Sequence, residues 1–238
     1  MGSFFEELDC QPTSIGLISL RRRREQRLGV DILELMLDDE HLMSDLFTTS
    51  EIALAKIGLN SIKSKANLTV VVGGLGMGFT ANAALSDPRV KDLVVVEKLA
   101  PVIGWHENGL LPHGKPLVES PKCRFVEGDF FEMAASKYGF DPEYSGQKFD
   151  AILLDIDHTP DFCLDPTHLK FYQPLGLKQL QRHLIKGGVF ALWSNEPPNV
   201  FFIDRLGSVF RTADATEVSF HNPLQNNNFV QSVYVAST

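Results

Sequence analysis

An apolar run that breaks into four closely spaced glycines, LTVVVGGLGMGF at residues 68–79, constrains this chain more than any other feature. The run predicts a buried strand, and the residues after the glycines predict a helix over 79–85. Glycines between a strand and a helix let the backbone turn sharply and approach a ligand, to which the helix start presents N–H groups. We therefore expect a bound cofactor to contact Gly73, Gly74, Gly76 and Gly78.

Apolar strands continue to alternate with helices after the glycines. Strands are expected at 92–97, 123–129, 148–155 and 189–194, and two β-type runs follow at 216–220 and 228–236. Continuous apolar strands alternating with helices predict an α/β fold in which helices cover both faces of a mainly parallel sheet. Ligands of such sheets bind beyond the carboxyl ends of the strands.

Residues ahead of the glycines form a smaller unit. Residues 15–45 read as short strands of a β-hairpin extension, and Thr48 to Glu51 has the spacing of a capping box that starts a helix reaching about Leu59. The predicted domains are an N-terminal extension with its connecting helix over 1–60, and a Rossmann-like domain over 61–238.

Charge and cysteine usage exclude several classes of protein. The net charge of −8 argues against nucleic acid as the main partner. The run Arg21–Arg24 is a local exception, for which we expect a solvated strand end or an oligomer contact, with an anion site as the alternative. Three widely spaced cysteines fit free thiols in a reducing compartment, and the acidic start MGSFFEELDC does not resemble a signal peptide. We expect a cytoplasmic protein that does not enter a membrane.

Residues 76–81, GMGFTA, fit the glycine fingerprint of dinucleotide sites, which is weak evidence alone. Glu97 ends the next strand about twenty residues later, where an acid can hold ribose hydroxyls of either NAD or S-adenosylmethionine. Asp129 follows the third strand and suits an acceptor for an adenine amino group. The two final β-type runs suit the reversed hairpin of methyltransferase-type sheets, so we favour an S-adenosyl cofactor over NAD.

A second cluster, LLDIDHTPDFCLD at 153–165, places acids and a histidine just beyond an apolar strand. One interpretation is a catalytic edge that attracts a cationic amine and takes its proton, with Asp155 as the main group and Asp157 or His158 as base. A second is a divalent-metal site built on Asp-x-Asp, and a third is a set of loop acids that cap a helix. We favour the catalytic edge and expect no metal.

The order GGLGMG, VVVEKLAPVIGWHENGLLP, RFVEGDFF, FDAILLDIDHTP and LIKGGVFALWSNEP resembles the spermidine synthase superfamily over about residues 30–238. The resemblance implies a seven-stranded methyltransferase-type sheet with an N-terminal β-hairpin that often joins subunits, hence a homodimer. It also implies that the glycines contact the methionine part of the cofactor, that Asp155 faces the sulfonium and the acceptor, and that Tyr172 lies on the substrate side. The residues expected to bind the cofactor are Gly73, Gly74, Gly76, Gly78, Glu97, Lys98, Asp129, Phe130 and Asp155.

Three parts of the sequence depart from the family pattern. Gly76 stands where aminopropyltransferases usually carry an aspartate that pairs with the amine of decarboxylated S-adenosylmethionine. The glutamine and tyrosine that help hold the polyamine align with Leu42 and roughly with Ser50 or Glu51, and the family's DSSDP is DIDHTP here. Sequence alone therefore slightly favours methyl transfer from S-adenosylmethionine to a small acceptor, most plausibly an amine. Aminopropyl transfer and a non-catalytic nucleoside-binding descendant remain the alternatives.

Further candidates have weaker support. An aromatic pair, Trp105 and His106, either flanks the adenine or belongs to the core. Residues near the ends of the last strands are further candidates for the acceptor side: Ser194, Glu196, His221 and Asn222.

Overall fold

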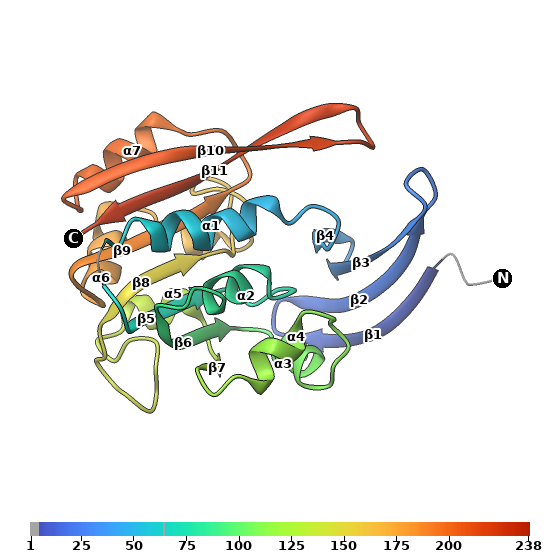
Figure 1. Cartoon of the computed structure of the whole chain (residues 1–238), viewed down its shortest axis with the longest axis horizontal. Coiled ribbons are helices and arrows are strands. Elements are labelled where there is room, and N and C mark those ends of the chain that lie inside the picture. Colours follow the sequence, from blue (N-terminus) through green and yellow to red (C-terminus); the bar gives the residue numbers. More distant parts are fainter. Residues whose placement is uncertain (1–4, 64) are drawn as a thin grey trace.

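The computed structural model describes residues 5–63 and 65–238, and the first four residues of the acidic N-terminal segment lie outside it. Figure 1 shows two sheets, with the N-terminal sheet lying beyond the carboxyl ends of the parallel strands of the larger one. The larger sheet has seven strands in the order β10-β11-β9-β8-β5-β6-β7. The α/β fold with a seven-stranded sheet and an N-terminal β-extension is confirmed.

Five strands of the large sheet are parallel: β5 (Leu68–Gly73), β6 (Val90–Glu97), β7 (Cys123–Glu127), β8 (Phe149–Leu154) and β9 (Leu184–Ser194). An apolar core covers each face of the sheet. In β5, for example, Val70 and Val72 belong to one core and Val71 belongs to the core on the opposite face. β5 pairs in parallel with β6 on one side and β8 on the other, so the strand order reverses there. Ligands of such sheets bind at that reversal.

Two antiparallel strands close the sheet, β10 (Thr212–Asn222) and β11 (Asn227–Ser237). β11 runs antiparallel to both β10 and β9, which confirms the reversed hairpin expected from the final β-type runs. Both strands extend beyond the predicted runs. β9 also begins earlier than the predicted start at residue 189, since Gly187 and Gly188 lie within it.

Helices cover both faces of the sheet, and several are shorter than the sequence indicates. α2 (Phe79–Leu85) follows the glycines as predicted. The helix after β6 is α3 (Ala100–Glu107), and a second helix that was not predicted, α4 (Gly114–Glu119), follows it. The other helical segments are α5 (Phe130–Ala135), the 3-10 turn η1 (Pro166–Lys170), α6 (Pro174–Gln181) and α7 (Val200–Gly207). In the described ranges 5–63 and 65–238, no helix is long and apolar enough to cross a membrane.

The N-terminal extension is a four-stranded antiparallel meander of β1 (Phe5–Thr13), β2 (Gly16–Glu25), β3 (Val30–Leu37) and β4 (Glu40–Ser44), of which β1 was not predicted. Each arginine of the run in β2 has an acidic partner: Arg21 with Glu7, Arg22 with Glu6, Arg23 with Glu25 and Glu34, and Arg24 with Asp31. These pairs compensate the charge within the sheet, so the run does not form an open anion site.

Helix α1 (Thr49–Asn60) connects the two sheets and packs on β8, β9 and β11 of the large one. It begins where the capping-box spacing predicts, but for a different reason, since the Thr48 side chain makes no capping hydrogen bond. Glu51 instead lies inside the protein, where it accepts a hydrogen bond of 2.7 Å from the Ser50 hydroxyl. The domain boundary at residues 60 and 61 stays a prediction.

Candidate functional site

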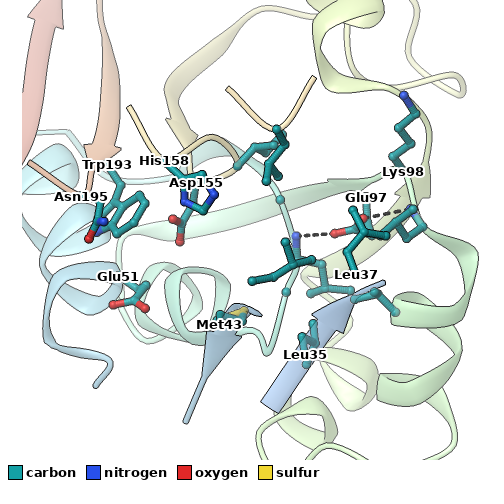
Figure 2. A pocket seen from close by; sticks show the side chains of 18 of the residues that line it. Leu35, Leu37, Met43, Glu51, Glu97, Lys98, Asp155, His158, Trp193 and Asn195 are labelled. Atoms are coloured by element: carbon teal, nitrogen blue, oxygen red, sulfur yellow. Dashed lines mark hydrogen bonds between the residues drawn. The ribbon is translucent and has the colours of Figure 1, made fainter. Parts of the chain in front are cut away.

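A cavity of about 950 Å³ lies at the carboxyl ends of the parallel strands, against the concave face of the N-terminal sheet. One side consists of strand ends and the loops after β5, β6, β7 and β8, which contribute Gly74, Glu97, Asp129 and Asp155. The other side is an apolar wall from the extension, with Leu35, Leu37 and Met43 facing the glycine loop in Figure 2. The cavity therefore meets the expectation that ligands bind at the strand-order reversal.

The glycine loop after β5 approaches its neighbours too closely for side chains. A Cβ on Gly74, whose φ is +93°, would lie 2.2 Å from the backbone oxygen of Asp155. At Gly76, where φ is +46°, a Cβ would lie 2.6 Å from the Met43 sulfur. These two glycines line the cavity, whereas the predicted contacts Gly73 and Gly78 do not, because they face Phe130 and His106. A buried histidine supports the loop from behind, since His106 Nε2 lies 2.8 Å from the Gly76 carbonyl oxygen.

Glu97 ends β6 and is 9% exposed. Its carboxylate accepts backbone N–H groups from Leu75 and Leu99, each at 2.9 Å, which fixes the loop after β5 to the loop after β6. Burial raises the pKa of Glu97, and these N–H groups offset part of that rise. Each carboxylate oxygen keeps a lone pair with which it can accept a ribose hydroxyl.

Asp129 follows β7 and is the N-cap of α5. Its Oδ1 accepts the N–H groups of Phe131 and Glu132 at 2.9 and 3.1 Å, and its Oδ2 lies 2.9 Å from Lys98 Nζ. Burial opposes ionisation here, but Lys98 and the Glu132 N–H outweigh it and lower the pKa of Asp129. Asp129, Lys98 and Phe130 all line the cavity, so the structure brings the predicted adenosine-binding residues to one end of it.

Two carboxylates meet at the other end of the cavity. Asp155 follows β8, and Glu51 projects from the first turn of α1 (Figure 2). The Thr80 hydroxyl lies 2.6 Å from Asp155 Oδ2 and 3.1 Å from the backbone oxygen of Glu51, which ties the two together. Burial, and then the charge of Glu51, raise the pKa of Asp155 to about 7. Burial also raises the pKa of Glu51. A carboxyl group that titrates near neutrality can exchange a proton with an amine.

Asp157 and Tyr172 are not at the cavity surface, in contrast to the catalytic roles expected for them. Asp157 is 1% exposed and accepts hydrogen bonds from the Tyr172 hydroxyl at 2.8 Å, from His168 Nδ1 at 3.0 Å and from the Leu164 N–H at 2.8 Å. Tyr172 is fully buried, and this burial, followed by the charge of Asp157, raises the pKa of Tyr172 well above the usual value. These contacts fix the loop after β8, so its two acids point in opposite directions: Asp155 into the cavity and Asp157 under it.

The remaining candidates divide in the same way. His158 lines the cavity and pairs with Glu40 of the extension at 3.1 Å. Trp105 belongs to the core, where its Nε1 donates to Asp9 Oδ2 at 2.6 Å. Asn222 lines the cavity, whereas three other candidates near the last strands do not: Ser194, Glu196 and His221. Across residues 5–63 and 65–238, no group of three or more His, Cys, Asp or Glu side chains could hold a metal ion.

Comparisons with known proteins support this geometry at the level of the fold. No protein-family model and no curated protein matches the chain. Among solved structures, spermidine synthase from Thermotoga maritima is similar with a TM-score of 0.72 and 18% identity, covering 97% of this chain and 72% of that one. A spermidine synthase in complex with the transition-state analogue AdoDATO is similar with a TM-score of 0.71 and 17% identity, covering the same shares of the two chains. The chain has the spermidine synthase fold.

The spermidine synthase fold of this chain brings residues to the cavity that the sequence analysis did not assign. Glu51 was missed because its spacing from Thr48 suggested a helix cap. In addition, the family's substrate-binding tyrosine aligned equally well with Ser50 and with Glu51. One face of the last strands also lines the cavity, with Trp193, Asn195, Phe220, Phe229 and Gln231. Their alternate spacing along three predicted strands was the available signal, since residues two apart on a strand share a face.

Proposed function

We propose that this chain transfers an aminopropyl group from decarboxylated S-adenosylmethionine to a small amine. The pair Glu51 and Asp155 carries the proposal, because it sets two carboxylates of raised pKa beside a glycine loop and an adenosine-sized space. The fold likeness to spermidine synthases, one of them with a transition-state analogue bound, supports the same reaction class.

The residues present fit an S-adenosyl compound. Glu97 would hold the ribose with the lone pairs its carboxylate keeps free, Asp129 and Phe130 would flank the adenine, and the tail would run along Gly74 and Gly76, which both line the cavity. Such a compound, when bound, supplies a carbon activated by positively charged sulfur. The protein then has to bind, align and deprotonate the acceptor.

Glu51 and Asp155 would perform that task at the acceptor end. Their negative charge attracts the amine in its protonated form. Asp155, in its ionised form, takes one proton and leaves a lone pair on nitrogen. That lone pair bonds to the carbon beside sulfur, the carbon–sulfur pair stays on sulfur, and methylthioadenosine leaves as a neutral product. The second amine proton then passes to Glu51 or to water.

The choice of donor depends on charge. A carboxylate on the donor's tail would lie against Leu35, Leu37 and Met43 and near two acids, where both desolvation and repulsion oppose it. Lys98 is the one lysine or arginine among the described lining residues, and it is already paired with Asp129. Sequence alone favours methyl transfer because Gly76 lacks the family's aspartate. The apolar, acidic surroundings instead favour a tail without a carboxylate.

Methyl transfer remains the second candidate because the Met43 sulfur occupies the space beside Gly76 that an aspartate side chain would need. The deciding experiment incubates the protein with a mixture of primary amines and either donor, and separates the nucleoside products. We expect methylthioadenosine from decarboxylated S-adenosylmethionine, lost in Asp155→Asn and retained in Asp204→Asn, which removes an exposed acid of α7. S-adenosylhomocysteine formed from S-adenosylmethionine alone would replace the proposal by methyl transfer. Binding of nucleosides without turnover would support the non-catalytic alternative.

The predicted homodimer stays a prediction, which light scattering would test.

A further inference from the structure

The last three strands build a wall that no role described so far explains. Trp193 of β9 lies opposite Val233 of β11, and Asn195, the residue after β9, accepts a hydrogen bond from Gln231 of β11. Gln231 and Phe229 in turn lie opposite Val218 and Phe220 of β10. Paired residues and residues two apart share one face of a sheet. Trp193, Asn195, Gln231, Phe229 and Phe220 therefore form one continuous surface, here called the acceptor wall, and all five line the cavity.

The acceptor wall adjoins the carboxylate pair. β9 is the neighbour of β8, which Asp155 directly follows, and β11 is the next strand beyond β9. β11 is thus two strand spacings, about 10 Å, from β8. Figure 2 shows Trp193 and Asn195 on the same side of the pocket as Glu51, Asp155 and His158, with Glu97 and Lys98 on the other side. An amine held by the two carboxylates would extend its far end over this wall.

Aromatic rings make up one part of the acceptor wall. Phe220 stacks on Phe229 with ring centroids 5.9 Å apart, and Phe47 of the segment before α1 stacks on Phe220 at 5.5 Å. All three rings line the cavity and are partly buried. Such a surface favours a flat or apolar molecular body.

Two unpaired polar atoms make up the other part. Gln231 is 8% exposed, and its Nε2 donates to Asn195 Oδ1 at 2.7 Å. Its Oε1 and the Nε1 of Trp193 are buried and have no hydrogen-bond partner among the described residues. Buried polar groups are normally paired, so an acceptor and a donor left unpaired on one surface indicate a group that a ligand supplies. A hydroxyl can accept from the Trp193 N–H and donate to the Gln231 oxygen, whereas an ammonium can only donate.

The acceptor wall also lacks charge that could hold a second cation. None of the described lining residues that β9, β10 and β11 contribute is an acid. Burying an unpaired ammonium costs more free energy than its attraction to aromatic rings returns. A diamine would therefore place its far end where the protein does not compensate its charge.

We propose that the acceptor is a monoamine whose far end carries a hydroxyl group on an apolar or aromatic body. This inference rests on the proposed function, whose carboxylate pair holds the amine end. The inference excludes a diamine acceptor, whereas aminopropyl transfer by itself is equally compatible with a diamine and with a monoamine.

Three amines of equal length test the inference: 5-amino-1-pentanol, pentylamine and 1,5-diaminopentane, each with either donor and with nucleoside release as the readout. We expect kcat/KM for the amino alcohol to exceed that of pentylamine by about 10-fold, because the latter leaves both buried polar atoms unpaired. We expect an advantage of at least about 10-fold over the diamine. Tyramine and phenethylamine repeat the hydroxyl comparison on an aromatic body.

Variants link the preference to the acceptor wall. Trp193→Phe and Gln231→Met each remove one polar atom and keep most of the side-chain volume, so each should bring the ratio of amino alcohol to pentylamine close to one. Glu217→Gln, an exposed residue on the opposite face of β10, should leave that ratio unchanged.

The outcomes separate the inference from the function on which it rests. Preference for the diamine, or an unchanged ratio in both wall variants, overturns the inference and leaves alkyl transfer to amines in place. Absence of nucleoside release with every amine and both donors overturns the proposed function and the inference together.

Discussion

Replacing Asp155 by asparagine should inactivate the protein and stabilise it at the same time. Asp155 is partly buried in the cavity beside Glu51, and these surroundings raise its pKa from 3.8 to about 7. Asparagine has the same shape and can still accept the hydrogen bond from Thr80. It carries no charge, so the cost of placing a carboxylate there disappears.

The sign and the pH range follow from the pKa change. The folded protein holds the Asp155 proton more tightly than the unfolded chain does, so between pH 3.8 and about 7 the unfolded chain loses the proton first and the free energy of unfolding falls as pH rises. The whole pKa change of Asp155 corresponds to about 4 kcal/mol in the free energy of unfolding. Water in the open cavity screens part of it, so we expect about 2 kcal/mol at pH 8, about 1 kcal/mol at pH 5 and close to zero near pH 3.

Urea unfolding of the wild type and of Asp155→Asn at these three pH values measures the difference directly. Asp204→Asn is the matched control, since an exposed acid should change the free energy of unfolding by less than about 0.5 kcal/mol, with no trend in pH. A stability gain for Asp155→Asn that is equal at pH 5 and pH 8, or a loss at pH 8, would refute the reasoning. Turnover should fall by about 100-fold or more in the same variant, because the proton acceptor is gone.

Three further changes test other parts of the site. Catalytic efficiency should rise with pH around a midpoint near 7, the pKa of Asp155. Glu51→Gln should move this midpoint to lower pH because it removes the neighbouring charge. An unmoved midpoint in the pH–rate profile would contradict the coupling of the two carboxylates. Gly74→Ala places a Cβ 2.2 Å from a backbone oxygen and should lower the free energy of unfolding in urea by at least about 3 kcal/mol. The control Gly109→Ala, at a φ of +71° with nothing within 4 Å, should lower it by about 1 to 2 kcal/mol. Glu97→Gln replaces a double acceptor by a group with one oxygen and should weaken binding of decarboxylated S-adenosylmethionine by about 10-fold in calorimetry; unchanged affinity would remove Glu97 from the donor site.

The parallel core could be predicted from the sequence because its physical signal is local. Each central strand is a continuous apolar run, and the glycine loop marks the first turn from strand to helix. The ends of the strands carry Glu97, Asp129 and Asp155, and parallel strands bring such ends together at one edge. Element boundaries were less certain, as with β9, where Gly187 and Gly188 lie within the strand rather than before it.

The site was harder to predict where a side chain can serve two purposes. Glu51 has the spacing of a capping residue, but its buried side chain lies in the cavity beside Asp155. That position results from the packing of α1 on the large sheet, which the local sequence does not reveal. Asp157 looks equivalent to Asp155 in sequence, yet residues two apart after the end of a strand need not share a side. Its partners Tyr172 and His168 lie eleven or more positions further along the chain, where no periodic pattern links them to it.

The proposed donor side and the proposed acceptor side of the cavity lie on different strands of the large sheet, which affects how such proteins can diversify. In the proposed function, the loops after β5, β6 and β7 would hold the donor, and their glycines and capping contacts tolerate few substitutions. The acceptor wall instead occupies alternate positions on a C-terminal hairpin whose turn, at 223–226, lies at the surface. If the proposed acceptor site is correct, exchanges at Phe220, Phe229 or Gln231 would change which amine is used and leave the donor side of the cavity intact, so this hairpin is the place to engineer new amine specificities.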